Sequence, residues 1–200
     1  MRPYQFTPER RNFTVNCDDS DIKIVPDKPS KVFDMSEGAA YAFIREKTNG
    51  NMEKARALGK RFAGELTAGR TGMAQFGVGA FDDQDTLAQR NVLFAFIVGR
   101  VIEEMAPNSI VAQSAMSAFY ETIERTSPEI YRQISDSAAL SLYIFSARST
   151  PGDETAAGEV FARLCGREGD ALFVAYGREL AGYFMDHCPR EASCVKMNRE

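Results

Sequence analysis

The longest regular pattern in the chain is a repeat of apolar residues at every third or fourth position, from residue 34 to residue 188. This spacing is typical of α-helices that bury one face. Short links join the predicted helices, so we expect an all-α fold, a multi-helix bundle or array of about six to eight helices packed antiparallel. The clearest stretch opens at Asp82 and Asp83, ends at Pro107, and has as apolar positions Leu87, Leu93, Phe94, Ile97, Val101 and Met105.

Individual residues predict where these helices begin and end. Ser, Thr, Asp and Asn accept hydrogen bonds from the free amides of a first turn, and Pro is favoured at the first helical position. The first helix should carry Ala40, Phe43 and Ile44 on one face and stop at Asn49–Gly50, and the last should end before Pro189. Starts or breaks are expected at Asp34, Asn51, Asp82–Asp83, Asn108 or Ser109, Ser127–Pro128, Ser135–Asp136, Thr150–Pro151 and Asp170.

The first 33 residues follow a different pattern. Prolines interrupt them, and residues 13–17 and 22–25 alternate with a period of two around an Asp-rich turn, a pattern compatible with a short β-hairpin. Two strands alone are only marginally stable, so we expect this arm to dock on its own domain or on a partner subunit. The predicted division is an extended N-terminal arm over 1–33, a single helical domain over 34–188 and a polar C-terminal tail over 189–200.

Charge and hydropathy exclude several classes of partner. The formal net charge is −4, and no Lys or Arg run is longer than Arg10-Arg11, which argues against nucleic acid as a partner. The longest apolar run, Val92 to Val98, is far shorter than the roughly 20 residues of a membrane span, so we expect a buried core helix and no membrane partner. The N-terminus lacks the apolar stretch of a secretory signal, which predicts a cytoplasmic protein with reduced thiols.

The single histidine, His187, limits the chemistry of the chain. A helical di-iron site needs two Glu-x-x-His pairs, and the residue three before His187 is Phe184. Zinc ligation by His187, Cys188 and Cys194 would need an unusual spacing, interrupted by Pro189. A nucleophilic site would have to use the same histidine, at a predicted helix terminus. We therefore expect no catalytic residues, no metal and no cofactor.

A glycine-rich segment, residues 69–81, is the first of two features that stand out. It is no phosphate loop, because a helical stretch precedes it and acidic residues follow it. It is either an ordered loop or part of a longer helix in which Gly64, Ala68 and Gly72 approach a neighbour. A loop of this length often carries function. Its candidate ligand-binding residues are Arg70, Phe76 and Phe81.

The second feature is Arg100, which comes two residues after the apolar run. A helix-surface ion pair with Glu104, one turn further on, is the favoured interpretation. The alternative is an anion-binding arginine in a pocket, and Arg100 is therefore the fourth candidate ligand-binding residue.

Three functions remain open after these exclusions. The favoured one is a protein-interaction or self-associating structural module that binds a protein partner or a second copy of itself as a homo-oligomer. The alternative is a helical small-molecule-binding domain with an apolar pocket near residues 69–81. The third is an enzyme that uses only Asp, Glu, Arg and Tyr; no spacing points to such a site, so a non-enzyme is favoured.

Overall fold

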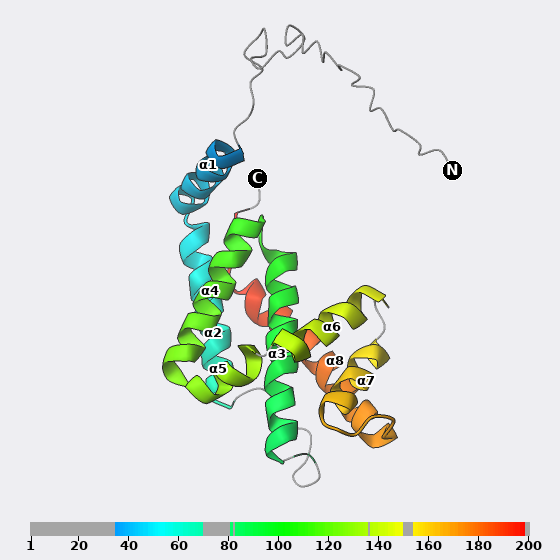
Figure 1. Cartoon of the computed structure of the whole chain (residues 1–200). Coiled ribbons are helices and arrows are strands. Elements are labelled where there is room, and N and C mark those ends of the chain that lie inside the picture. Colours follow the sequence, from blue (N-terminus) through cyan, green and yellow to red (C-terminus); the bar gives the residue numbers. More distant parts are fainter. Residues whose placement is uncertain (1–34, 70–80, 82, 136, 150–153, 199–200) are drawn as a thin grey trace, which may run out of the picture. The chain divides into compact units, whose positions relative to one another are not determined.

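The computed structural model describes residues 35–69, 81, 83–135, 137–149 and 154–198. These residues form eight α-helices and no strand, which confirms the prediction of an all-α fold (Figure 1). The predicted hairpin and the expected helix start at Asp34 lie outside the described residues. The helices are α1 (Met35–Thr48), α2 (Asn51–Thr67), α3 (Gln84–Met105), α4 (Ser109–Thr126), α5 (Pro128–Ser135), α6 (Ser137–Ser149), α7 (Glu154–Leu164) and α8 (Ala171–Ser193).

The chain divides into two compact units, Met1–Gly38 and Ala39–Glu200. In the first unit the structure describes the opening turn of α1. In the second unit α3 is the central helix, and it contacts α2, α4, α5, α6, α7 and α8. The most extensive helix pairs are α2 with α4 and α7 with α8, and Figure 1 shows them on opposite sides of α3.

Helix α3 is central because its sequence leaves no polar side over two turns. All residues from Val92 to Val98 are buried, as the uninterrupted apolar run predicts. The helix begins where Asp83 accepts hydrogen bonds from the Thr86 amide at 2.9 Å and the Thr86 hydroxyl at 2.6 Å. Both hydrogen bonds hold the pKa of the Asp83 carboxyl below its usual range, and the bond from the Thr86 hydroxyl has the larger effect. An acidic N-cap thus starts the helix that organises the core.

Glycine sets the distance between the two helices of each main pair. A Cβ atom on Gly59 of α2 would lie 2.0 Å from the carbonyl oxygen of Ala115 on α4, and one on Gly158 of α7 would lie 2.3 Å from that of Val174 on α8. By contrast, a Cβ atom on Gly64 would meet nothing within 4 Å, and α2 ends at Thr67. The alternative in which Gly64 approaches a neighbouring helix is therefore wrong, and the close contact of α2 lies about one and a half turns earlier, at Gly59.

Most predicted helix boundaries agree with the structure, but the last one does not. Asn108 and Asp170 are N-caps as predicted, and α5 and α6 are separated after Ser135. Helix α8, however, continues through Pro189 to Ser193. Proline removes one helical hydrogen bond, yet Cys188 and Ala192 on either side of it are fully buried, and their packing maintains the helix.

Candidate functional site

The structure does not gather the four predicted ligand-binding residues into one site. Arg70 and Phe76 lie outside the described residues. Phe81 precedes the first turn of α3, and Arg100 lies about 24 Å further along that helix at the usual rise per residue. The two described candidates therefore belong to separate environments.

Phe81 packs into an aromatic cluster on α8. Its ring stacks on Tyr176 at 4.0 Å between centroids and meets Phe173 edge-on at 5.2 Å. The guanidinium of Arg90 lies 5.9 Å from the centre of the same Tyr176 ring. Phe81 therefore packs against α8 through these two rings.

Arg90 is the buried arginine of α3, with only 2% of its surface exposed, and it was not among the predicted site residues. A usable signal was present: Arg90 follows Thr86 by one turn and precedes Phe94 by one turn, so it lies on the inner face. Arg100 was a predicted candidate because it follows the apolar run, yet its side chain is exposed.

Arg100 lines a groove of about 390 Å³ between α3, α4 and α6. The predicted pair with Glu104 does not form, and Arg100 makes no ion pair within the part of the chain that the structure describes. Two other charged residues, Glu103 and Arg148, share the lining. The large apolar lining residues are Phe96, Met116, Tyr120, Leu140 and Ile144.

A cluster of charged residues joins α2 to α8 around the single histidine. His187 Nε2 lies 3.0 Å from a carboxylate oxygen of Glu65, and its ring stacks parallel to that of Tyr183. One ligand atom each from Glu65, His187 and Glu191 lies within 4.8 Å of the others, a set that could hold a metal ion. Arg61 pairs with both carboxylates, so one of their two negative charges is compensated inside the cluster. We interpret this cluster as an ion-pair network between two helices.

The cysteines next to His187 do not join that cluster. Cys188 is fully buried in the core, and burial raises the pKa of its thiol to about 12, whereas Cys194 is exposed. The combination of His187 with these two thiols, considered for zinc, is therefore not assembled. Sequence spacing could not indicate Glu65, which comes from a distant helix, whereas Glu191 lies one turn after His187 on α8 and could have been identified.

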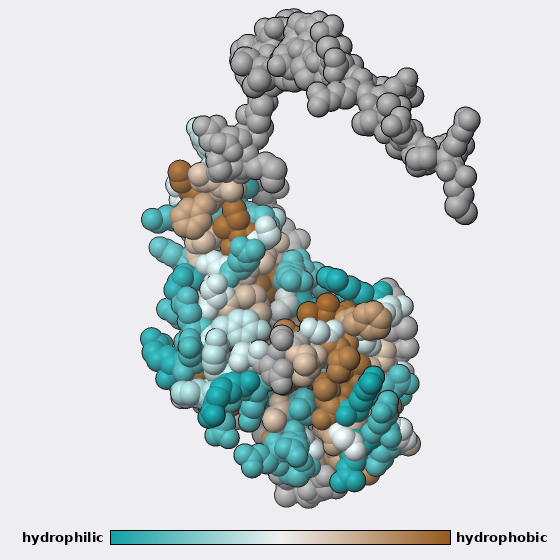
Figure 2. Space-filling model, viewed as in Figure 1, coloured by the Kyte–Doolittle hydropathy of each residue, from teal (hydrophilic) through white to brown (hydrophobic). Residues whose placement is uncertain are grey.

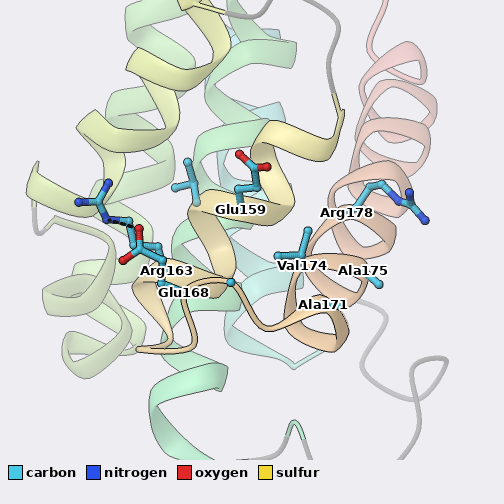
Figure 3. A pocket seen from close by; sticks show the side chains of 9 residues that line it. Glu159, Arg163, Glu168, Ala171, Val174, Ala175 and Arg178 are labelled. Carbon is cyan, nitrogen blue, oxygen red and sulfur yellow. Dashed lines mark ion pairs between the residues drawn. The ribbon is translucent and has the colours of Figure 1, made fainter.

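A shallow depression of about 540 Å³ lies between α7 and α8 (Figure 3). Arg163 and Glu168 lie side by side in it as an ion pair of 3.8 Å, and both side chains are largely exposed. Arg178 points away from this pair (Figure 3). Exposed pairs of this kind contribute little free energy, and the depression offers no convergent set of groups.

Helix α1 exposes the apolar face that its sequence pattern predicts. Ala40 is exposed, and the exposed fractions of Tyr41, Phe43 and Ile44 are 78%, 46% and 61%. We call the three large exposed residues, Tyr41, Phe43 and Ile44, the α1 face; Tyr41 was not part of the predicted face. Apolar side chains are visible on this helix and also over α6 in Figure 2. Single exposed apolar residues are common, but here three large ones are exposed within four positions.

The opposite side of α1 is fixed by Glu46, which is 2% exposed. Its Oε2 accepts hydrogen bonds from the side-chain amides of Asn51 at 2.7 Å and Asn49 at 3.1 Å. Its Oε1 accepts from Asn108 at 2.9 Å and from Arg45 at 3.0 Å. These bonds, above all that from Asn51, hold the pKa of the Glu46 carboxyl below its usual range. The buried carboxylate thus attaches the end of α1 while the α1 face stays open to solvent.

Comparison of the chain with protein-family models, with curated proteins and with solved structures finds no match to any of them. Within the described helices, none has both the length and the apolar character that crossing a lipid bilayer requires.

Proposed function

We propose that this chain is a protein-interaction module that self-associates through the α1 face. The observation that carries the proposal is the exposure of Tyr41, Phe43 and Ile44 on one short helix. Removing apolar surface from water contributes about 25 cal/mol per Å², so covering these three side chains favours association.

A second copy of the chain is the partner that the α1 face fits most simply. A two-fold interface uses the same patch on both subunits, and one exposed patch is therefore sufficient. The exposed basic residues Arg45 and Lys47 both lie near the C-terminal end of α1. An antiparallel pair of α1 helices keeps these charges at opposite ends of the interface, whereas a parallel pair would place like charges together. We therefore propose an antiparallel α1–α1 contact.

The mass of the full-length protein in solution tests this proposal. Light scattering over a range of concentrations should show a dimer in equilibrium with monomer. The variant Ile44→Glu should be a monomer with unchanged helix content, because a buried, unpaired carboxylate is costly. Phe145→Glu is the matched control, since Phe145 is a 72% exposed aromatic residue on α6, and this variant should still dimerise.

Two results would contradict the proposal. A wild-type chain that stays monomeric at all concentrations would exclude self-association. A dimer that survives Ile44→Glu but dissociates with Phe145→Glu would place the interface on α6. The alternative function, small-molecule binding beside residues 69–81, stays a prediction because residues 70–80 lie outside the described part of the chain.

A further inference from the structure

We infer that the groove between α3, α4 and α6 is a binding site for an amphipathic carboxylate, a molecule with one carboxylate head and an apolar chain. Its volume of about 390 Å³ falls within the range of roughly 300–1,000 Å³ that is usual for small-molecule sites. The inference concerns a surface separate from the α1 face and does not depend on self-association.

The apolar part of the groove is built on well-packed helices. Phe96 belongs to the buried run of α3, and its ring stacks on the buried Tyr143 of α6 at 5.3 Å. Met116 and Tyr120 come from α4, and Ile144 comes from α6. Because three helices contribute, the apolar lining is present before a ligand arrives, which reduces the entropy lost on binding.

The polar part of the groove selects the head group. Arg100 on α3 and Arg148 on α6 both line it, and neither makes an ion pair with any residue that the structure describes. A guanidinium group binds a carboxylate through two parallel hydrogen bonds. Glu103 also lines the groove, so the three charges sum to +1, which suits a ligand with a single negative charge.

The same charges argue against the α1 helix of a second copy as the occupant. The exposed charges at the C-terminal end of α1 are Arg45 and Lys47, which Arg100 and Arg148 would repel. An acidic amphipathic helix of another protein would satisfy the charges. The limited volume favours one small molecule over a helix, which needs several anchoring pockets along its length.

Titration with decanoate, a ten-carbon carboxylate, tests the inference by calorimetry and by melting temperature. Decanoate should bind the full-length protein and raise its melting temperature. Decanol, which has the same chain without the charge, should bind more weakly. Arg100→Gln and Arg148→Gln should each weaken decanoate binding roughly threefold, and roughly tenfold together.

Two further variants distinguish binding in the groove from binding elsewhere on the protein. Gly99 lines the groove, and a Cβ atom at this position would meet only Met116, at 3.6 Å. Gly99→Leu therefore places a side chain in the groove. This variant should abolish decanoate binding without unfolding the protein. Arg125→Gln removes an exposed arginine that does not line the groove and should leave binding unchanged. The inference is wrong if decanoate does not bind, if the Arg100 and Arg148 variants bind equally well, or if an acidic amphipathic peptide binds while decanoate does not.

Discussion

At the scale of the residue, Gly59 shows how the absence of one side chain sets the distance between two helices. A Cβ atom at this position would overlap the backbone of α4 at Ala115, and backbone cannot rotate away as a side chain can. Gly59→Ala should therefore lower the free energy of unfolding by about 1–3 kcal/mol, the usual cost of overpacking a core. Chemical denaturation of the full-length protein measures this loss.

Gly64 provides the control for that prediction, because it lies in the same helix with open space around its Cα. Gly64→Ala should raise the free energy of unfolding by about 0.5–1 kcal/mol, since alanine restricts the unfolded chain and favours the helix. Equal effects of the two substitutions would show that helix propensity, and not the contact with α4, determines the result at Gly59.

The residues that line a candidate site could be identified from the sequence only in part. Arg100 was identified as unusual, and the structure places it in a groove, but Arg148 comes from another helix and no spacing connects the two. Arg90 was missed because the apolar run next to Arg100 was the more conspicuous pattern. Contacts between distant helices depend on packing, which the one-dimensional pattern does not contain.

At the scale of the helix, the buried carboxylate of Glu46 joins elements that are far apart in sequence. It accepts bonds from Asn51 at the start of α2 and from Asn108, the N-cap of α4. Asn51 in turn exchanges two hydrogen bonds with the backbone of Asn198, beyond the end of α8. The end of α1 is thereby attached to three other parts of the helical body.

Glu46→Gln should weaken this junction, because the glutamine amide replaces an acceptor oxygen with a donor that faces other donors. The expected loss in the free energy of unfolding is about 1.5–3 kcal/mol at neutral pH, the range for hydrogen bonds to charged groups. Glu124→Gln, at an exposed position on α4, is the control and should change stability little.

Acid should remove the same contribution in the wild-type protein. The pKa of Glu46 is lower in the folded state, so its stabilisation is fully present above the ordinary glutamate pKa of about 4.3 and is lost as pH falls through the folded pKa. The stability difference between wild type and Glu46→Gln should therefore shrink in acid. Urea unfolding at neutral pH and near pH 3 measures it, and a constant difference would contradict this account.

Helix starts were more predictable than helix ends or helix faces. Caps such as Asp83 and Asp170 act within a few residues, so local sequence is sufficient to identify them. The continuation of α8 through Pro189 depends on the burial of Cys188 and Ala192, which is a tertiary effect. Likewise, periodicity predicted an apolar face on α1, but periodicity does not say whether the chain itself covers that face.

At the scale of the whole molecule, the exposed α1 face should make stability depend on protein concentration. A partner that binds the folded chain and not the unfolded chain shifts the folding equilibrium by mass action, and here the partner is a second copy. The melting temperature of the wild type should rise as concentration increases, and that of Ile44→Glu should stay constant. Differential scanning calorimetry over a wide concentration range makes the comparison.

The position of the α1 face also predicts how Ile44→Glu and the wild type should compare at each protein concentration. Glu46 attaches α1 through its opposite side, so the hydrogen bonds that fix the helix do not compete with the proposed dimer contact. Ile44→Glu should therefore match the wild type at the lowest concentration, where both are monomers, and fall below it only as concentration increases. A variant that melts lower at every concentration would instead show that Ile44 stabilises the monomer, and the α1 face would then be part of the fold and not an interface.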